Sequence, residues 1–217
     1  EGPFQANPEN PIATHRGWRG PVGNVGHADF VQTAEGHWFA VLLGVRVRGD
    51  PPVHVLGRET FLAPVTWSDG WPSIGDGGRI SQIMSGSLPP PTPWPPKELR
   101  DDFGDEKLGL VWNFLRNPHE GVWSLADRPG WLRLRGRAVT LDSVGAPAFV
   151  GRRQQHVRFR ASTRMEFDPQ LEGEEAGLAL RMTDKHHAEI VVTREGGRLQ
   201  LILKLRNGER RHILARH

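Results

Sequence analysis

The stretch that decides the fold class runs from Ala188 to Leu205 and reads AEIVVTREGGRLQLILKL. Two runs rich in apolar and β-branched residues flank Glu195-Gly196-Gly197, and glycines at such a place supply the positive φ that a tight hairpin turn needs. No 3.6-residue apolar period is present, which argues against a helix. The stretch therefore predicts a β-hairpin.

The sequence on both sides extends this hairpin into an antiparallel sheet. Ala176–Met182 precedes it, and Arg211–Ala215 follows after a second turn signal at Asn207-Gly208. Further upstream, Val157–Phe167 alternates apolar and polar side chains over its length, and Trp131–Leu134 begins another run of this kind. Short strands separated by regular turns are typical of a β-sandwich.

A proline-rich stretch divides the chain in two. Leu88–Pro96 reads LPPPTPWPP, and such a run favours an extended polyproline II spacer because its prolines lack backbone donors. We therefore expect residues 1–88 to form one segment, residues 89–98 a linker, and residues 99–217 the β-sandwich. Because another strand-like run comes just before His217, we expect the sandwich to be incomplete at its C-terminus.

The first segment contains few strands. His37–Val45 and Thr60–Thr66 are strand-like, with turn signals at Ala34–Gly36 and Ser68–Gly70. Fewer than about 90 residues with so few strands make a poor independent core. We therefore expect residues 1–88 to belong to a larger all-β domain and to fold poorly alone, since unpaired strand edges would remain.

Composition excludes several kinds of function. The chain has no cysteine, which removes disulfides, thiolate metal sites and cysteine nucleophiles. No apolar run is long enough to predict a membrane-spanning helix. The net charge is only +3, and Arg158, Arg160 and Arg164 alternate with apolar residues, as on the solvated face of one strand. We therefore expect neither a nucleic acid nor a membrane as partner.

The histidines show no metal-binding spacing. The four in the first segment are His15, His27, His37 and His54. No His-x-x-x-His pair lies on a predicted helix, and adjacent side chains such as His186 and His187 point to opposite faces of a strand. Gly-x-Ser-x-Gly and phosphate-loop motifs are also absent. Taken alone, each histidine is best interpreted as structural.

Two stretches stand above this background. Gly23–Val31 places His27 and Asp29 in a glycine-rich turn that leads into a strand, and Arg58 follows a glycine just before another strand. An arginine at such a place can form paired hydrogen bonds to adjacent hydroxyls or orient a carboxylate. It could equally be a salt-bridge partner of Glu59 or Asp29, and residue chemistry leaves both readings open.

These stretches carry a resemblance to a known family. Gly26–Val31, Gly36–Arg46 and Leu56–Trp67 resemble the late blades of family 43 glycoside hydrolases, above all their β-xylosidase branch. Asn7–Arg16 resembles the segment that connects blades in that branch. After the linker, four stretches resemble its C-terminal concanavalin-like sandwich: Asp101–Phe103, Trp112–Pro118, Arg128–Leu134 and Phe149–Gln155.

The resemblance implies an all-β architecture in which a five-bladed β-propeller carries the active site and is followed by the sandwich. It implies an inverting glycoside hydrolase that releases terminal xylose or arabinose from xylo-oligosaccharides or arabinoxylan. Inversion needs an acid and a base roughly 6.5–9.5 Å apart, and the family adds a further Asp. None of the three carboxylates is found here, so we expect them upstream of residue 1 and this chain to be an inactive fragment, truncated at both ends.

Residue by residue, the resemblance implies a few roles. Glu1-Gly2-Pro3 is similar to the family's acid motif, but Phe4 and the residues after it match a different loop, so Glu1 is not expected to be the acid. Arg58 matches the arginine that contacts sugar hydroxyls. His27 matches a substrate-binding histidine near the propeller axis that in some members helps to hold Ca²⁺. No other cofactor is expected, and homo-oligomers occur in this branch.

A second hypothesis makes the sandwich the working part, as a non-catalytic carbohydrate-binding or interface module. A binding platform would present exposed, coplanar tryptophans on one sheet face, and Trp112, Trp123 and Trp131 are the candidates. Large aromatic side chains are more often part of a core. A flat exposed row of these three, together with measurable oligosaccharide affinity, would favour the module.

Overall fold

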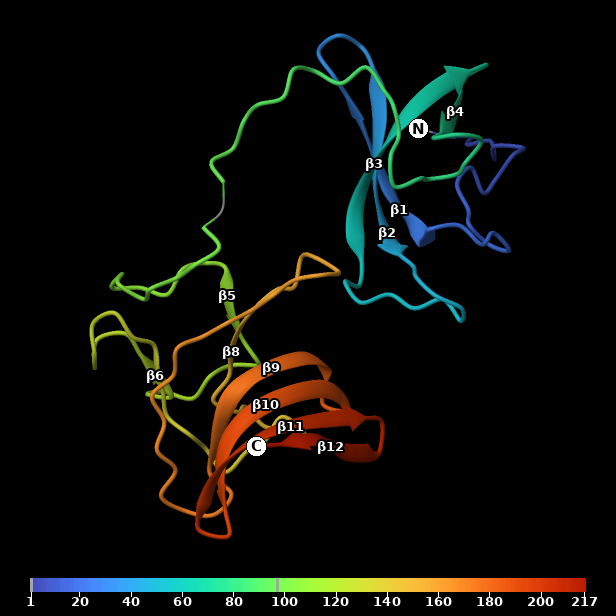
Figure 1. Ribbon diagram of the computed structural model, residues 1–217. Coiled ribbons are helices and arrows are strands. Elements are labelled where there is room, and N and C mark those ends of the chain that lie inside the picture. Colours follow the sequence, from blue (N-terminus) through green and yellow to red (C-terminus); the bar gives the residue numbers. More distant parts are fainter. Residues whose placement is uncertain (1, 97) are drawn as a thin grey trace. The chain divides into compact units, whose positions relative to one another are not determined.

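The computed structural model describes residues 2–96 and 98–217, and every regular element in those ranges is a β-strand (Figure 1). The all-β fold class is thus confirmed. The chain divides into two compact units, one made of Glu1–Pro96 with Gln154–Arg158 and the other of Lys97–Arg153 with Phe159–His217. The described residues include no helix that is long and apolar enough to cross a membrane.

The first unit is built on a four-stranded antiparallel sheet in the order β1-β2-β3-β4. Its strands are β1 (Val22–Gln32), β2 (Trp38–Arg46), β3 (Glu59–Ser68) and β4 (Trp71–Ile74). The two strands predicted from apolar runs, β2 and β3, are confirmed within two residues at each end. The sequential order of neighbouring strands is that of a propeller blade, in which each strand pairs with the next along the chain.

The hydrophobic core cluster of this unit lies on one face of the sheet, although Phe39 and Val45 of β2 are also buried, on the other face. Ala40 and Leu42 of β2 lie beside Ala63 of β3, and all three are almost fully buried. Ile80 covers them from the segment after β4 and is itself 0% exposed. The period of two in β2 sends alternate side chains to this face, as expected for a strand with a packed side.

The second unit is built on another four-stranded antiparallel sheet, in the order β12-β11-β10-β9. These strands are β9 (Glu175–Thr183), β10 (His186–Glu195), β11 (Arg198–Asn207) and β12 (Arg210–Arg216). All four were predicted, and both turn signals join the strands that they were expected to join. Two small ladders complete the unit: β5 (Trp112–Phe114) with β8 (Val150–Arg152), and β6 (Trp123–Ser124) with β7 (Arg133–Leu134).

The two faces of the β9–β12 sheet differ in chemistry. One face carries both apolar and charged side chains and is covered, with Val191, Ile202 and Arg206 at most 7% exposed. The opposite face is apolar and open. Its exposed members on β9, β10 and β11 are Leu178, Leu180, Met182, Ile190, Leu199 and Leu201.

The strand predicted at Val157–Phe167 does not form. This stretch has no strand or bridge assignment, and Phe159 and Met165 are 47% and 37% exposed. A strand needs a neighbour to receive its backbone hydrogen bonds, and alternation of side chains alone does not provide one. The run predicted from Trp131 likewise forms only the two residues of β7.

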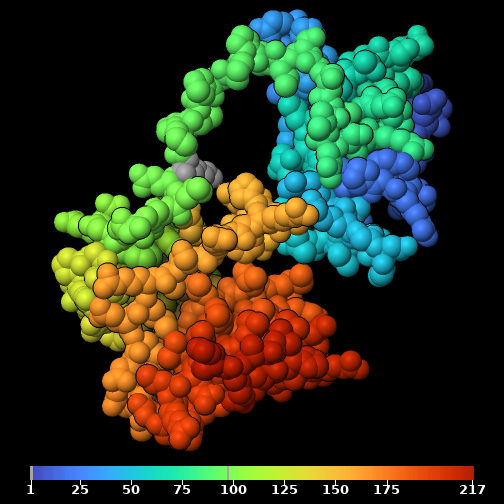
Figure 2. Space-filling view, in the orientation of Figure 1, coloured from blue at the N-terminus to red at the C-terminus, as the bar shows by residue number. Residues whose placement is uncertain are grey.

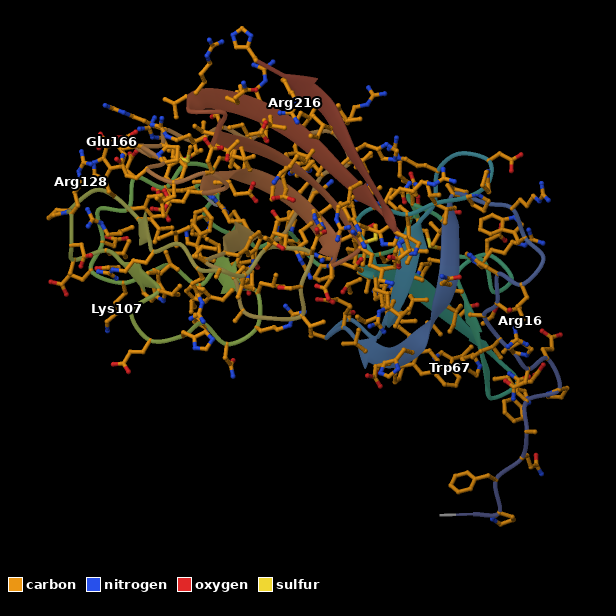
Figure 3. The ribbon with its side chains drawn as sticks, turned by 90° about the horizontal axis from the view of Figure 1, so that it is seen from below. Arg16, Trp67, Lys107, Arg128, Glu166 and Arg216 are labelled. Atoms are coloured by element: carbon orange, nitrogen blue, oxygen red, sulfur yellow. The ribbon has the colours of Figure 1, made fainter. Side chains whose placement is uncertain are left out.

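Side chains hold the extended stretch in place instead of a ladder. Arg128 forms an ion pair with Glu166, and Figure 3 shows the two side chains next to each other. The guanidinium of Arg128 lies 4.0 Å from the centroid of the Trp131 ring, and that of Arg164 lies 5.4 Å from it. The ring is thus flanked by cations, an arrangement that is favourable for tryptophan.

The proline-rich stretch packs against little of the chain. Residues 89–96 are all exposed, and Figure 2 shows most of this stretch as a lone run of chain. Trp94 in its middle is 86% exposed. This is how an extended proline-rich spacer behaves, because it has no internal hydrogen bonds and a fully solvated backbone.

Candidate functional site

His27 lies at an irregularity in β1. Between Gly23, which pairs with Val45, and Asp29, which pairs with Val41, β1 contains two more residues than β2, and the register shifts on both sides of Gly26. His27 takes a φ of 54° and Asn24 a φ of 51°. The sequence predicted a turn here, but the residues form a doubly bulged strand.

A positive φ at this position is informative. It is uncommon for any residue other than glycine and costs free energy, so it persists where the surrounding structure imposes it, often beside functional sites. A bulge also redirects a side chain away from the regular alternation of its strand. His27 itself is exposed, so its imidazole is open to solvent.

Arg58 lies at the end of the loop that connects β2 to β3. It follows Gly57, which has a φ of 72°, and directly precedes Glu59, the first residue of β3. Its side chain is exposed and has neither a hydrogen bond nor an ion pair with any residue that the structure describes. Both partners that the sequence allowed for Arg58, Glu59 and Asp29, are thus excluded.

The partner of Glu59 is Arg46. Arg46 Nη2 donates to Glu59 Oε1 at 2.7 Å and Arg46 Nε donates to Glu59 Oε2 at 2.9 Å. This paired hydrogen bonding holds the pKa of Glu59 below its ordinary value, against a smaller opposing effect of burial. It raises the pKa of Arg46. Both groups are therefore charged at neutral pH.

The sheet register brings His27 and Arg58 to the same region of the first unit. Gly26, next to His27, pairs with Leu43, and Leu43 pairs with Thr60, which comes two residues after Arg58. Adjacent strands are about 4.8 Å apart, which places β1 and β3 about 10 Å apart. His27 on β1 and Arg58 just before β3 therefore belong to the same region of the first unit.

No metal site accompanies His27 in the described residues. They contain no group of three or more His, Asp or Glu side chains that could hold a metal ion. Imidazole is also a poor ligand for Ca²⁺, which prefers six to eight oxygen atoms. The residues present therefore do not fit a calcium site by themselves. Glu1, the other residue considered for chemistry, lies outside the described residues.

The three candidate tryptophans of the second unit do not form an exposed row. Trp112, Trp123 and Trp131 are each half-buried. Trp112 packs beside Phe103 with ring centroids 5.5 Å apart, and Trp123 packs beside Phe114 at 5.6 Å. These aromatic contacts consolidate the loops of the unit.

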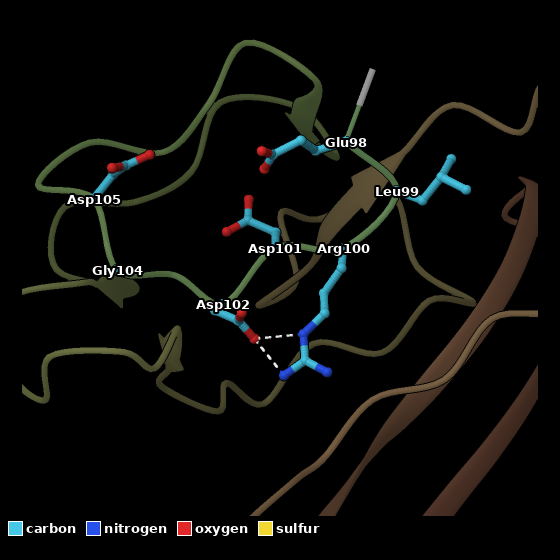
Figure 4. Close-up of a pocket in the computed structure, with 7 residues that line it drawn as sticks. All are labelled: Glu98, Leu99, Arg100, Asp101, Asp102, Gly104 and Asp105. Atoms are coloured by element: carbon cyan, nitrogen blue, oxygen red, sulfur yellow. Dashed lines mark hydrogen bonds and ion pairs between the residues drawn. The ribbon is translucent and has the colours of Figure 1, made fainter. Parts of the chain in front are cut away.

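An open pocket of about 510 Å³ also lies in the second unit (Figure 4). It is lined by residues of one loop, four of which carry carboxylates: Glu98, Leu99, Arg100, Asp101, Asp102, Gly104 and Asp105. Asp102 accepts a hydrogen bond from Arg100 Nε at 2.7 Å, and Asp101 accepts one from Trp112 Nε1 at 2.6 Å. These bonds shape the loop, and they give no sign of a ligand.

Two family matches together cover most of the chain. Residues 100–217 match the beta xylosidase C-terminal concanavalin A-like domain, and residues 1–72 match glycosyl hydrolases family 43. The first match spans more than half of the chain.

Curated relatives agree with these matches. A non-reducing end alpha-L-arabinofuranosidase of Bacteroides ovatus is 43% identical over 94% of this chain. A beta-xylosidase of Bacillus subtilis is 32% identical over 90% of it. The chain spans 39% and 38% of the lengths of these two relatives.

Solved structures resemble the chain in fold as well. The Bacteroides ovatus protein described as Xyloglucan PUL GH43B superposes with a TM-score of 0.85 at 36% identity, over 99% of this chain and 42% of the other. The xylan beta-1,4-xylosidase of Bacillus halodurans superposes with a TM-score of 0.86 at 30% identity, again over 99% and 42%.

Proposed function

Since the chain belongs to glycoside hydrolase family 43, in the branch whose β-xylosidases carry a concanavalin A-like domain, we propose that it is part of an inverting glycosidase that releases terminal xylose or arabinose. Xylo-oligosaccharides or arabinose-decorated xylans are the substrates. The names of the relatives support this substrate class, since they include a beta-xylosidase and an arabinofuranosidase. Within the whole enzyme, this chain contributes sugar-binding groups.

The observation that carries this proposal is the placement of two exposed side chains in one region of the first unit: His27 on the bulged part of β1 and Arg58 just before β3. A guanidinium presents several N–H groups in a fixed plane and can donate two parallel hydrogen bonds to vicinal sugar hydroxyls. An imidazole can donate or accept one more. Such fixed contacts orient the terminal sugar relative to the reacting bond.

The bond-breaking groups come from other parts of the enzyme. Inverting hydrolysis requires a carboxylic acid that protonates the leaving oxygen and a carboxylate that activates water on the opposite face of the sugar. Glu59, the carboxylate next to Arg58, is bound to Arg46. We therefore propose that residues 1–217 alone do not hydrolyse glycosides, and no step is assigned to a metal.

Kinetics of the full-length polypeptide test the role of Arg58. Arg58→Ala should lower kcat/KM by about a hundredfold on p-nitrophenyl β-D-xylopyranoside or α-L-arabinofuranoside, as expected for two hydrogen bonds from a charged donor. Arg48→Ala is the matched control, because Arg48 is an exposed arginine of the same loop, and it should change kcat/KM less than twofold. An Arg58→Ala enzyme with unchanged kinetics would overturn the proposal.

A further inference from the structure

We propose that the Arg46–Glu59 ion pair is a clamp that positions Arg58 for sugar binding. The inference rests on the proposed function, because it gives the pair a role only if Arg58 binds substrate. Arg46 and Glu59 are positioning residues in this account, since they act through Arg58 rather than on the sugar.

The pair closes the loop that carries Arg58. Arg46 is the last residue of β2 and Glu59 is the first of β3, so their side chains join the two ends of the connection formed by residues 47–58. Gly44 pairs with Glu59 in the ladder, which places Arg46 beyond the last paired residues. The ion pair therefore extends the β2–β3 pairing by side chains where the backbone ladder has ended.

The geometry of the pair favours a fixed orientation. Besides the two short bonds, Arg46 Nε lies 3.2 Å from Glu59 Oε1, so one guanidinium edge faces one carboxylate. The side chains are only 35% and 26% exposed. Planar paired contacts of this kind add directional specificity that a single ammonium contact lacks. Glu59 is thereby held in one orientation, and its neighbour Arg58 shares that constraint through the backbone.

The rest of the loop fixes Arg58 from the other side. Arg48 and Val53 exchange two backbone hydrogen bonds of 2.8 Å, which shortens the free part of the loop. Leu56 is 6% exposed and anchors the chain two residues before Arg58. Gly57, between them, supplies a left-handed turn with a φ of 72°. Arg58 thus lies between a buried anchor and the clamp, with only Gly57 and its own backbone left to move.

A double-mutant cycle in the full-length polypeptide tests the clamp. Glu59→Gln and Arg46→Gln should each raise KM about tenfold and change kcat little, because a misplaced Arg58 loses contacts made to substrate and transition state alike. Arg48→Gln should leave KM unchanged, because Arg48 is exposed and supports the loop only through backbone bonds to Val53, which the substitution keeps. The exchanged pair Arg46→Glu with Glu59→Arg should recover most of the affinity, which a loss of fold would not do.

The cycle is closed in an Arg58→Ala background. If the clamp acts through Arg58, then adding Glu59→Gln to Arg58→Ala raises KM no further. An equal increase in both backgrounds overturns the clamp while leaving the sugar-binding role of Arg58 intact. If Arg58→Ala alone leaves kcat/KM unchanged, the proposed function itself fails, and the clamp fails with it. Where Arg46→Gln lowers the yield of folded protein, Arg46→Lys keeps the charge but not the paired bonds, and it should still raise KM.

Discussion

Ile190 and Val191 are neighbours on β10, yet their side chains lie on opposite faces of the β9–β12 sheet, with 42% and 5% of their surface exposed. Ile190 pairs with Leu203 of β11 and Leu178 of β9, so it lies within a continuous apolar row. An exposed apolar face of this extent on a folded domain marks a surface that another layer covers. We propose that this layer is the second sheet of the sandwich, supplied by residues other than 1–217.

Lysine substitutions at Ile190 and Val191 should have different effects on stability, because the two side chains lie on opposite faces of the sheet. In the 217-residue chain, Val191→Lys should lower the free energy of unfolding by about 3 kcal/mol, because it moves a charged ammonium from water into an almost fully buried position. Ile190→Lys should change it by less than about 0.5 kcal/mol, as surface substitutions do, and should raise solubility. Urea unfolding and the soluble concentration measure both effects. In a longer polypeptide that covers this face, Ile190→Lys should become as destabilising as Val191→Lys. If Ile190→Lys changes the free energy of unfolding as little in the longer polypeptide as in the 217-residue chain, the second layer is contradicted.

His15 joins two buried backbone groups of the first unit. Its Nδ1 donates to the carbonyl of Val22 at 2.7 Å, and its Nε2 accepts from the backbone N–H of Ile80 at 2.9 Å. His15→Ala leaves both groups without a partner, so it should lower the free energy of unfolding by about 2 kcal/mol. His37→Ala, an exposed histidine in a turn, should have no measurable effect. Chemical denaturation of the full-length variants measures both effects. Equal free energies of unfolding for His15→Ala and His37→Ala would contradict the structural role of His15.

The backbone conformation at His27 predicts an unusual order of stability among variants at this position. Because its φ is 54°, His27→Gly removes a conformational cost, whereas His27→Ala keeps it. The glycine variant should be more stable than the alanine variant by about 1 kcal/mol, and both should bind substrate equally weakly. Thermal unfolding and KM measured on the same preparations check this. An alanine variant as stable as the glycine variant would show that the bulge does not persist.

Glu189 gives a prediction that depends on pH. Its side chain is 14% exposed, and burial raises its pKa despite Lys204 3.8 Å away and His187 3.2 Å away. A raised pKa means that the ionised carboxylate costs stability in the folded state. Glu189→Gln should therefore raise the Tm above the folded-state pKa, and this gain should vanish as the pH falls below the ordinary value of 4.5.

A carboxylate with the opposite shift serves as the control. Lys185 lowers the pKa of Glu209, so Glu209→Gln should give no gain in Tm at any pH. Thermal melts of both variants between pH 3.5 and 8 test the pair. A fall in Tm for Glu189→Gln at pH 8 would show that its contacts with Lys204 and His187 outweigh the cost of its burial.

The sequence predicted those parts of the fold that depend on local pattern. β10 and β11 follow from alternation and a Gly-Gly turn, and they form as expected. Val157–Phe167 shows the same alternation without forming a strand, because pairing depends on a neighbouring strand that periodicity does not reveal. Local pattern thus fixes which residues can be strands, and the available partners decide which of them become strands.

The site shows the same division. The glycines around His27 predicted a turn, which is instead a doubly bulged strand with a positive φ at His27, and the glycine beside Arg58 also has a positive φ. The sequence did not reveal that Glu59 would bind Arg46 rather than Arg58, because the two residues are thirteen positions apart and meet only through the β2–β3 ladder. The bond from Ile80 to His15 spans 65 positions and was equally invisible.

Sequencing the coding DNA on both sides of this segment tests the central claim most directly. That claim is that His27 and Arg58 serve a glycosidase whose acid and base lie elsewhere in the same polypeptide. We predict that the reading frame continues upstream into further propeller blades that carry the catalytic carboxylates. A start codon directly before Glu1 would leave the natural product without them, and it would contradict the glycosidase account in favour of a non-catalytic module.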